Sequence, residues 1–518
     1  MDETRGLLRE MEENGFVPDG FTYAILFDGL VKSGDGEGAI NLYENAREKG
    51  VQINNYTASI LLNGLCKEGK VEEAEELLKR LIEHGLLPDE VIYNTLVNGY
   101  CRVGDINGAL SIIERMESRG LRPNSVAFNS VIDKFCGMQK MEEAEEWVKR
   151  MVEKGVLPSV ETYNTLINGY GKLCSFDMCF QILEEMEKNG IKPNVVSYGS
   201  LINCLSKAEK ILEAEVVLRD MIGRDISPNA QIYNMLIDGS CTRGKIKDAF
   251  RFFDEMLRKE IRPTLITYNS LINGLCKKGR MLEAEDLVIQ INSSGYSPDV
   301  ITYNSLISGY SNAANAQRCL ELYETMKSSG IKPTVQTYHP LITGCSKEGI
   351  GIIETLYNEM LQMNLAPDQV VYNAMILCYI ENEEVKKAFA LRLEMSERGI
   401  HADKMTYNSL ILGLFKEERL SEVKVLVEDM KSKGLAPKAD TYSILVKGHC
   451  DLKDFLGAYV WYREMFENGF LLDVGICNEL ASGLRQEGRV LEAQIVCTEM
   501  SAKGVDDCSI SEEQSAVA

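Results

Sequence analysis

The sequence predicts an all-α protein, a right-handed α-solenoid of helix-turn-helix hairpins, because one 35-residue pattern returns along almost the whole chain. Two short amphipathic segments recur in every interval, and proline marks the interval with a fixed spacing. The next proline after this regular series, Pro367, follows after 34 residues. A period of this length is typical of stacked helical repeats, not of separate globular domains. The regular prolines are Pro88, Pro123, Pro158, Pro193, Pro228, Pro263, Pro298 and Pro333.

The repeats divide the chain into three parts. Residues 20–508 hold an array of about fourteen repeats, residues 1–19 hold the second half of one more repeat, and residues 509–518 form a polar tail. We number each repeat so that the residue after the proline is position 35 and the residue after that is position 1 of the next repeat. Ile53 and Ala402 stand where proline is expected, without loss of register. The repeat at 335–368 is one residue short and carries Pro340, which predicts a local irregularity.

The first helix of each repeat is predicted at roughly positions 3 to 13. Tyr93, Leu96, Val97 and Tyr100 show the spacing i, i+3, i+4 and i+7 that gives a helix one apolar face. Glycine at position 15 suits the left-handed turn that ends such a helix. This glycine recurs as Gly69, Gly104, Gly244, Gly279 and Gly488.

The second helix follows at once, as in KVEEAEELLKRLIEHG at 70–85. It ends at another glycine near position 31, and the proline that follows prevents its continuation. Each repeat is therefore predicted to be an αα-hairpin with a short return loop. The second glycine recurs as Gly85, Gly120, Gly155, Gly190, Gly295, Gly330, Gly399 and Gly434.

A single hairpin buries too little apolar surface to fold alone, so neighbouring hairpins are expected to stack. Alanine at position 20 allows close approach, and methionine near position 27 fills the space between neighbours. Trp147 and Trp461 share position 23, which we interpret as a core position. The packing residues are Ala74, Ala109, Ala144, Ala214, Ala249 and Ala284, with Met116, Met151, Met186, Met221 and Met256.

The composition excludes several classes of protein. No apolar run approaches 18 residues, so no membrane span is expected. Of the 15 cysteines, six share position 12, which separates neighbours by roughly 10 Å, too far for a disulfide or a shared metal ion. We interpret them as packed thiols in a reducing compartment. These six are Cys66, Cys101, Cys136, Cys241, Cys276 and Cys450.

Motifs for catalysis are missing from the sequence. It contains no HExxH, no phosphate-binding loop and no nucleophile elbow, and the paired acids of EEAEEL fit a solvated face of the second helix. The prediction is therefore a protein that is not an enzyme and has no metal, no cofactor and no small-molecule substrate.

The repeated motif is YNTLINGxCKxG, followed by EEAxxLxxxM and G(I/L)xP(D/N). It resembles the repeat of the pentatricopeptide repeat family of plant organelles, and the resemblance covers about 490 of 518 residues. All repeats but one have 35 residues and the tail carries no HxE and CxxC pair, which resembles the pure P-type subclass. This resemblance implies sequence-specific binding of single-stranded RNA. The alternative is a tetratricopeptide-like scaffold for protein partners, whose period is 34 and whose W-x2-L-G-x2-Y signature is absent here.

By the same resemblance, positions 5 and 35 of each repeat read one base. Short donors and acceptors at these positions suit the Watson–Crick edges of unstacked bases. The alternative remains open that asparagine at a helix start and aspartate after proline only cap helices and close turns. The predicted pairs are Ser59 with Asp89, Asn94 with Asn124, Asn129 with Ser159, Asn164 with Asn194, Gly199 with Asn229, Asn234 with Thr264, Asn269 with Asp299, Asn304 with Thr334, His339 with Asp368, Asn373 with Asp403, Asn408 with Lys438 and Ser443 with Asp473.

Position 13 is basic in eight repeats and is predicted to hold RNA phosphates, although the net charge is −22. A cation at a helix C-terminus also suits the helix dipole, so a structural role stays open. These residues are Lys32, Lys67, Arg102, Lys172, Lys207, Lys277, Lys347 and Lys416. The resemblance further implies that position 2 clamps base faces through Val91, Val126, Val196, Ile266, Ile301 and Val370, a pattern from which Glu161 and Asp440 depart.

The resemblance also implies an organelle, with the mitochondrion as the first expectation and the chloroplast as the alternative. The chain begins MDETRGLLREM, without an Arg-rich and acid-poor presequence. The expected partners are single-stranded RNA and other RNA-processing proteins, and no membrane. Occupying a site on a transcript would serve its stability, processing, splicing or translation.

Overall fold

The computed structural model describes residues 11, 14, 16, 18–51 and 53–501. Helices α2 to α29 alternate as first and second members of hairpins, which confirms the predicted all-α repeat, while Cys508 and residues 509–518 lie outside the described residues. The first helices are α2 (Gly20–Lys32), α4 (Asn55–Lys67), α6 (Glu90–Val103), α8 (Ser125–Gly137), α10 (Val160–Lys172), α12 (Val195–Lys207), α14 (Ala230–Thr242), α16 (Leu265–Lys277), α18 (Val300–Asn312), α20 (Val335–Gly344), α22 (Gln369–Glu381), α24 (Lys404–Lys416), α26 (Ala439–Asp451) and α28 (Val474–Gln486). The second helices are α3 (Gly36–Glu48), α5 (Val71–Glu83), α7 (Ile106–Ser118), α9 (Met141–Glu153), α11 (Phe176–Lys188), α13 (Ile211–Gly223), α15 (Ile246–Arg258), α17 (Met281–Ser293), α19 (Ala316–Ser328), α21 (Ile350–Gln362), α23 (Val385–Glu397), α25 (Leu420–Ser432), α27 (Phe455–Glu467) and α29 (Val490–Ser501).

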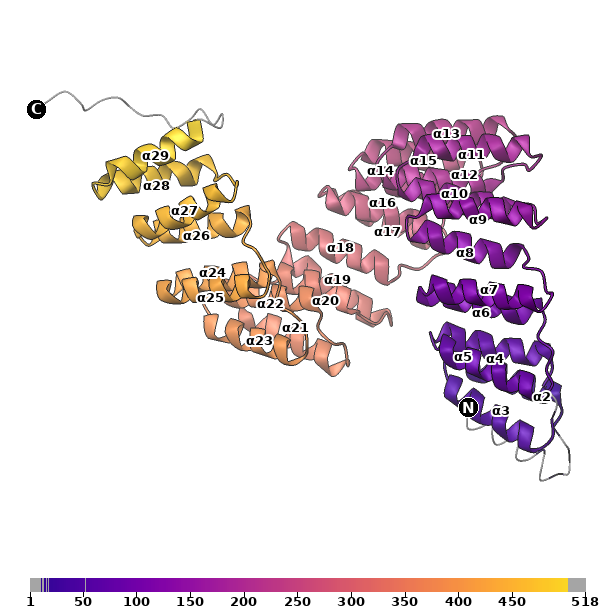
Figure 1. Cartoon of the computed structure of the whole chain (residues 1–518). Helices are drawn as coiled ribbons and strands as arrows, with labels where there is room; N and C mark the ends of the chain where they lie inside the picture. The colour runs from indigo at the N-terminus through magenta and orange to yellow at the C-terminus, as the bar shows by residue number, and fades with distance from the viewer. Residues whose placement is uncertain (1–10, 12–13, 15, 17, 52, 502–518) are drawn as a thin grey trace, which may run out of the picture. The chain divides into compact units, whose positions relative to one another are not determined.

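Two compact units make up the described chain, one ending at Thr267 and the other beginning at Tyr268, within α16. In each unit, hairpin follows hairpin as a stack (Figure 1). First helices of neighbouring hairpins contact each other, as α4 contacts α6 and α22 contacts α24. Second helices pack on the first helix of their own hairpin and on that of the next, as α5 does on α4 and α6. The first helices therefore form a layer within each unit.

The first helices begin at position 1, two residues earlier than predicted. In α6 the carboxylate of Asp89 accepts a hydrogen bond from the backbone N–H of Ile92 at 3.1 Å, so position 35 caps the helix and extends it. The second helix α5 is slightly shorter than the predicted 70–85.

Both predicted turns use left-handed backbone. At position 15, φ is 81° for Gly69, and Glu209 keeps a φ of 63° where glycine is absent. At position 31, Gly85 has a φ of 94° and Asp225 one of 59°. The turn is thus fixed by the hairpin geometry, and glycine relieves its strain.

The residues predicted to pack are buried. The position-20 alanines and the position-27 methionines are fully buried, and Trp147 and Trp461 are more than nine-tenths buried. The position-12 thiols are also buried, and burial raises the pKa of Cys66 to about 11 and that of Cys101 to about 12. The thiols of Cys66 and Cys101 therefore stay protonated and unreactive at neutral pH.

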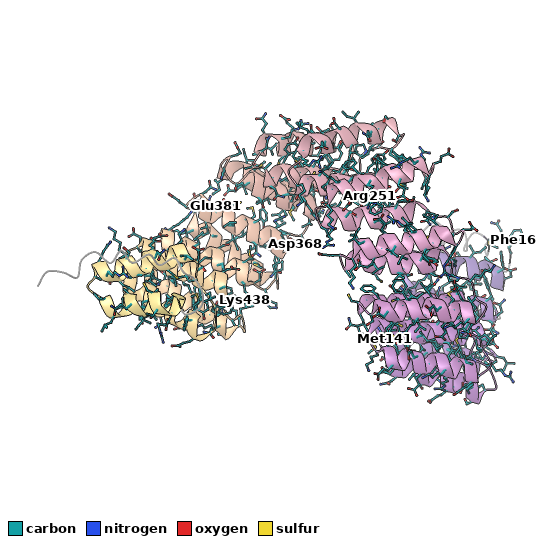
Figure 2. The ribbon with its side chains drawn as sticks, turned by 90° about the horizontal axis from the view of Figure 1, so that it is seen from above. Phe16, Met141, Arg251, Asp368, Glu381 and Lys438 are labelled. Carbon is teal, nitrogen blue, oxygen red and sulfur yellow. The ribbon has the colours of Figure 1, made fainter. Side chains whose placement is uncertain are left out.

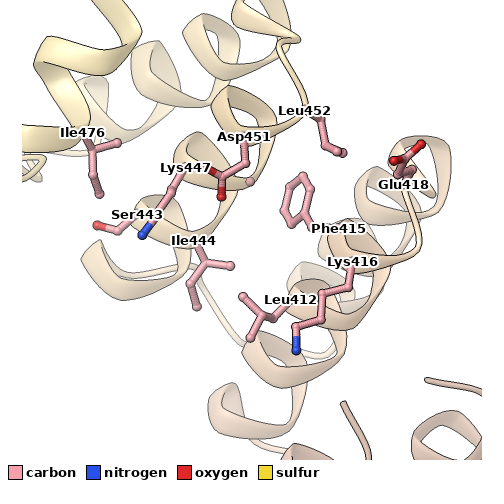
Figure 3. A pocket seen from close by; sticks show the side chains of 11 residues that line it. Leu412, Phe415, Lys416, Glu418, Ser443, Ile444, Lys447, Asp451, Leu452 and Ile476 are labelled. Atoms are coloured by element: carbon pink, nitrogen blue, oxygen red, sulfur yellow. The ribbon is translucent and has the colours of Figure 1, made fainter. Parts of the chain in front are cut away.

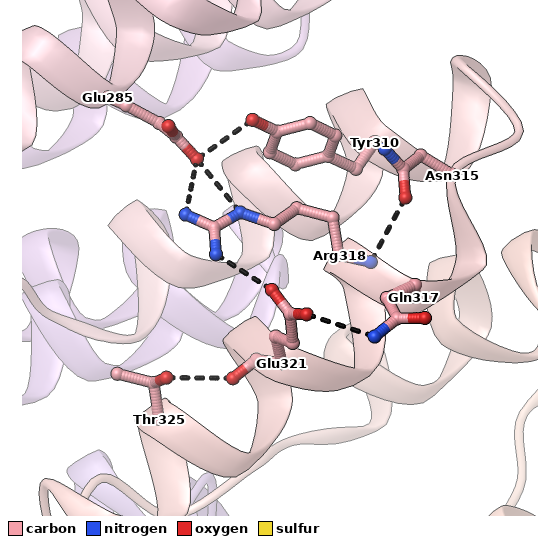
Figure 4. Close-up of polar contacts among 7 residues, drawn as sticks. All are labelled: Glu285, Tyr310, Asn315, Gln317, Arg318, Glu321 and Thr325. Carbon is pink, nitrogen blue, oxygen red and sulfur yellow. Dashed lines mark hydrogen bonds and ion pairs between the residues drawn. The ribbon is translucent and has the colours of Figure 1, made fainter.

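Polar contacts tie neighbouring hairpins together. Glu285 of α17 accepts hydrogen bonds from the hydroxyl of Tyr310 at 2.8 Å and from Arg318 Nη2 at 2.7 Å (Figure 4). Arg318 also donates to Glu321 at 2.8 Å, within α19. One carboxylate thus joins a second helix to both helices of the next hairpin, and Glu75 with Tyr100 and Arg115 repeats the arrangement in the other unit.

The short repeat is irregular, as predicted. Its first helix, α20, has 10 residues and contains Pro340, whereas α18 and α22 have 13 each. Proline lacks the N–H that would continue the helical hydrogen bonds. Gly349, at the start of α21, has a φ of 107°, a conformation that favours glycine.

An ion pair between second helices gives a testable dependence of stability on pH. Arg251 of α15 donates two hydrogen bonds of 2.8 Å to the two carboxylate oxygens of Glu215 in α13. These bonds, with those of Arg219, lower the pKa of Glu215 to about 2. Because the folded pKa lies below the unfolded one, the stabilisation is present above about pH 4.5 and is lost as the pH falls towards 2.

Glu215→Gln is therefore expected to lower the free energy of unfolding by roughly 2 kcal/mol at pH 7, since Glu215 is 9% exposed. The difference from the unmodified protein should shrink from pH 5 to pH 3. Urea unfolding at several pH values measures it. The control is Glu142→Gln, at an exposed carboxylate that forms no ion pair in the described chain. A constant difference across this range would contradict the assignment.

Candidate nucleic-acid interface

First helices present one open face in each unit, because they pack on neighbouring first helices and on their own second helix. Positions 2, 5, 9 and 13 follow each other at intervals of three or four residues, so they lie along this face. In α10 these are Glu161, Asn164, Asn168 and Lys172, none of them a buried residue. Position 35 lies just before each first helix, as Lys438 does before α26 (Figure 2).

Most position-35 side chains cap the following helix. Oδ1 of Asp299 accepts from the backbone N–H of Thr302 at 2.9 Å, and Oδ1 of Asp403 accepts from that of Thr406 at 2.9 Å. Lys438 makes no such bond. The capping role that the sequence left open is thus confirmed for position 35. Asn124, Asn194, Asn229, Asp368 and Asp473 cap in the same way, and Ser159 and Thr334 do so within capping boxes.

Position-5 asparagines reach these caps across 30 residues of sequence. Nδ2 of Asn269 donates to Oδ1 of Asp299 at 3.0 Å. The two positions predicted to read one base therefore lie side by side. The same contact joins Asn94 to Asn124 at 3.1 Å, Asn234 to Thr264 at 3.2 Å and Asn373 to Asp403 at 3.1 Å.

A threonine at position 3 of the following repeat orients the amide. Oγ1 of the fully buried Thr302 donates to Oδ1 of Asn269 at 2.6 Å. The amide nitrogen of Asn269 must then face Asp299, which leaves the second of its two N–H groups without a protein partner on a residue that is 6% exposed. Equivalent bonds join Thr162 to Asn129, Thr267 to Asn234, Thr337 to Asn304 and Thr406 to Asn373.

Some polar atoms at positions 5 and 35 have no hydrogen-bond partner within the described chain. Asp299 accepts its bonds from Thr302 and Asn269 at Oδ1, and no group of the described chain bonds to its Oδ2. Where Ala127 and Ser197 replace threonine at position 3, Oδ1 of Asn94 and of Asn164 is buried without a partner among the described residues. Oδ1 of Asn408 is also unpartnered there.

The other predicted pairs are not joined by a direct hydrogen bond in the described chain. Ser59 donates instead to the carbonyl of Tyr56 at 2.8 Å, and Gly199 has no side chain to offer. Burial lowers the pKa of the His339 imidazole, and nearby Asp368 opposes that shift. The pairs without a direct bond are Ser59–Asp89, Asn129–Ser159, Asn164–Asn194, Gly199–Asn229, Asn304–Thr334, His339–Asp368, Asn408–Lys438 and Ser443–Asp473.

Position 2 carries a row of exposed apolar side chains. Val91 is 58% exposed and Val370 is 49% exposed, although each stands on a helix with an ample buried face. Exposed apolar groups arranged in a row favour contact with the flat face of a ligand. The row comprises Phe21, Tyr56, Val91, Val126, Val196, Ile266, Ile301, Val370 and Met405, of which Phe21, Tyr56 and Met405 extend the predicted set. Glu161 and Asp440 interrupt it, as the sequence indicated, and position 2 also lacks an apolar side chain at Gln231, Gln336 and Gly475.

The position-13 cations are all exposed, but they are not equivalent. Lys32 forms an ion pair with Asp28 at 2.6 Å, and Lys416 donates to the carbonyl of Ile380 at 3.1 Å. In the part of the chain that the structure describes, the other six form no ion pair. They are Lys67, Arg102, Lys172, Lys207, Lys277 and Lys347.

Cavities lie along the open face of the first helices. One of about 360 Å³ is lined by Asn164, Gly199 and Asn229, and one of about 530 Å³ by Arg102, Val126 and Asn129. They bring together residues predicted to read bases, clamp base faces and hold phosphates. A third, also about 530 Å³, is lined mainly by apolar side chains such as Leu412 and Ile444, with Lys416 and Lys447 beside them (Figure 3).

Features of a metal site or a membrane span are not found in the described residues. They hold no group of three or more His, Cys, Asp or Glu side chains placed to bind a metal ion. None of their helices combines the length and the apolar character needed to cross a bilayer.

Comparison with known sequences identifies the repeats. The model of the PPR repeat family matches residues 26–67, 88–137, 123–172, 158–207, 193–241, 228–277, 263–312, 298–347, 367–416 and 402–451, and a second PPR repeat model matches 56–86 and 440–470. A mitochondrial pentatricopeptide repeat-containing protein of Arabidopsis thaliana is 55% identical over 172 residues. That match covers 33% of this chain and 21% of the relative, about a fifth of the relative's length.

Comparison with solved structures gives the same repeat architecture. The crystal structure of the pentatricopeptide repeat protein PPR10 from maize is similar with a TM-score of 0.64 and 25% identity, covering 96% of this chain and 76% of that one. PPR10 in complex with an 18-nucleotide psaJ RNA element gives a TM-score of 0.65 at 23% identity, covering 97% and 77%.

Proposed function

The chain belongs to the PPR repeat family, and on this premise we propose that it binds single-stranded RNA in a sequence-specific way, with one base at each repeat. The observation that carries the proposal is the joined pair of positions 5 and 35. At Asn269 and Asp299, one amide N–H and one carboxylate oxygen remain side by side, next to a row of exposed apolar side chains. PPR10, which has the same architecture, has been crystallised with an RNA element.

Each pair would read a base through the atoms that the protein leaves unbonded. A free amide N–H beside a free carboxylate oxygen complements an edge with one acceptor and one donor, as uracil has. The family resemblance assigns uracil to Asn269 with Asp299 and to Asn373 with Asp403. It assigns guanine to Ser59 with Asp89. Apolar side chains at position 2, such as Val370 of the Asn373 repeat and Met405 of the next repeat, would stack against the base.

Capping and base recognition are compatible at position 35. The cap of α18 uses Oδ1 of Asp299, whereas recognition would use Oδ2. The cap also holds the carboxylate still, so that the reading group is fixed before RNA arrives. Such preorganisation lowers the entropy lost on binding.

The proposed mode of action is occupancy of a transcript, without catalysis and with no cofactor. Stability, processing, splicing and translation of the RNA would each respond to a bound protein. The mitochondrial relative favours a mitochondrial location, with the chloroplast as the alternative. RNA-processing proteins would then meet this chain on the RNA.

A filter-binding experiment tests the proposal against the protein-scaffold alternative. An RNA pool of random sequence is selected on the protein, and the best RNA is compared as a single strand and as a duplex with its complement. We expect the single strand to bind at least tenfold more tightly, because pairing hides the edges that positions 5 and 35 read. No binding to any single strand at low salt would favour the scaffold.

A further inference from the structure

Position 9 of the first helix carries a polar side chain in most repeats. None of the predicted roles, which are base reading, contact with base faces and phosphate binding, uses this position. In five repeats it is an asparagine: Asn63, Asn98, Asn168, Asn203 and Asn273. None of these five residues is buried, and within the described chain none of their side chains makes a hydrogen bond. The hydroxyls at position 6 behave differently, since Thr95 and Thr165 donate to their own helix, to the carbonyls of Val91 and Glu161. The five asparagines at position 9 are thus hydrogen-bonding groups that the described chain leaves free on this face.

The residue at position 9 varies together with the residue at position 13. Every asparagine there stands four residues before a cation without an ion pair, as Asn98 stands before Arg102. Where position 9 is aspartate, the cation is absent or neutralised. Asp133 precedes Gly137, Asp238 precedes Thr242, and Asp28 forms the 2.6 Å ion pair with Lys32. The amide and the free cation therefore occur as one unit: Asn63 with Lys67, Asn98 with Arg102, Asn168 with Lys172, Asn203 with Lys207 and Asn273 with Lys277.

The order of residues on the helix matches the order of groups in a nucleotide. Position 9 lies one helical turn, about 6 Å, from position 5 and the same distance from position 13. If position 5 contacts the base and position 13 the phosphate, the group between them is the ribose. The cavities support this placement, because Asn168 and Asn203 line the same cavity as Asn164, and Asn98 lines that of Arg102 and Asn129.

We propose that the position-9 asparagines bind the ribose 2′-hydroxyl, so that each asparagine–cation unit holds the sugar and phosphate of one nucleotide and selects RNA over DNA. The inference rests on the proposed function and deepens it. An amide both donates and accepts, and the 2′-hydroxyl does the same. An amide also leaves the neighbouring cation uncompensated, which a carboxylate four residues away does not, and so phosphate binding is preserved.

The chain contains its own control. Position 9 is Leu377 in the repeat of Asn373 and Leu412 in that of Asn408, and a leucine side chain cannot hydrogen-bond to a hydroxyl. Sugar recognition should therefore vary along one bound RNA. It should be present opposite the asparagine repeats and absent opposite these two.

The experiment uses the full chain and the best single-stranded RNA selected from a random pool. Riboses are replaced by deoxyribose one at a time, and each dissociation constant is compared with that of the all-RNA strand. We expect a loss of about 2- to 10-fold per replacement opposite Asn98, Asn168 and Asn203, and none opposite Leu377 and Leu412. In Asn168→Ala, replacing the ribose opposite residue 168 by deoxyribose should no longer lower the affinity. In Leu412→Asn, replacing the ribose opposite residue 412 by deoxyribose should lower the affinity, which it does not do in the unmodified protein.

These outcomes separate the inference from the proposed function. Two results would show that position 9 does not bind the sugar even though RNA still binds. In the first, every deoxyribose replacement lowers the affinity equally. In the second, the loss of affinity at the nucleotide opposite residue 168 is the same in Asn168→Ala as in the unmodified protein. If no RNA is selected at all, the proposed function itself fails. Asn98→Ala gives the same comparison in another repeat, and both side chains project from the helix without protein partners, so neither variant should disturb folding.

Discussion

Replacing four first-helix cations by glutamine is expected to weaken RNA binding by about a hundredfold or more and to reduce its dependence on salt. Each phosphate contact to a single strand contributes about 0.7 to the slope of log affinity against log salt concentration. Four lost contacts should therefore lower the slope by about 3. The side chains are exposed and form no ion pair within the described chain, so the substitutions remove charge without removing a structural bond. They are Lys67, Arg102, Lys172 and Lys207.

The matched control removes four exposed lysines of the second helices and their C-terminal turns, so that both variants lower the formal net charge of −22 by the same amount. If RNA lies on the first helices, this control should keep nearly the original affinity and salt slope. Fluorescence anisotropy with a labelled single strand over a range of salt concentrations gives both quantities. Equal losses in the two variants would show that the total charge, and not the position-13 row, governs binding. The control lysines are Lys247, Lys259, Lys386 and Lys424.

This comparison also addresses how an acidic protein binds a polyanion. Many acids lie on second helices, where cations of neighbouring helices pair with them, as Arg115 does with Glu75 at 2.8 Å and Arg251 with Glu215. The free cations of position 13 stand on the first helices instead. A local field of this kind acts within about 10 Å at moderate salt, so the net charge is a poor guide to it.

The hairpin, its turns and its packing residues could be predicted from the sequence because they depend on one repeat at a time. Apolar spacing gives the helices, and recurring glycine and proline give their ends. The first helix begins two residues earlier than its apolar spacing indicates, because the side chain at position 35 caps it and the helix therefore starts at position 1. Asp89 and α6 show this directly.

Contacts between repeats could not be predicted in the same way, because they depend on how neighbouring hairpins are aligned. The bond from Thr302 to Asn269 joins position 3 of one repeat to position 5 of the preceding one. A Cβ added to Gly99 would lie 2.4 Å from Sγ of Cys66, so the recurring glycine at position 10 makes room for the thiol of the repeat before it. The sequence shows that both residues recur, but not that they touch.

The difference among the position-13 cations has a local cause that the sequence contains. Lys32 stands four residues after Asp28, a spacing that favours an ion pair on a helix. The residue at position 9 therefore distinguishes Lys32, which follows an aspartate, from the five cations that follow an asparagine. Lys416 differs for another reason, since its bond to the carbonyl of Ile380 requires the neighbouring first helix.

Exchanging one reading residue is expected to change which RNA binds best. Asn269→Thr, with Asp299 kept, should shift the preference at that nucleotide from uracil towards guanine. The amide N–H of Asn269 is replaced by a hydroxyl, which the family resemblance pairs with a purine when position 35 is aspartate. At about 1 to 3 kcal/mol for a mispaired or unstacked base, the preference between two RNAs that differ at this nucleotide should change by tenfold or more.

The measurement compares both proteins with both RNAs, and the ratio of the four dissociation constants gives the change in specificity independently of any general loss of affinity. Asn269→Ala is the control, since it removes the amide without supplying a hydroxyl. That control should bind both RNAs weakly and with little preference. Thermal unfolding of the variants checks that losing the bond from Thr302 leaves the fold intact.

The outcome distinguishes capping from recognition at the level of single atoms. Asp299 caps α18 through Oδ1 in the unmodified protein and should continue to do so in Asn269→Thr, because that bond comes from the backbone of Thr302. A change in base preference would therefore have to arise at the free Oδ2 and at the new hydroxyl. If both proteins instead bind the two RNAs equally, positions 5 and 35 stabilise the helices and the base is read elsewhere.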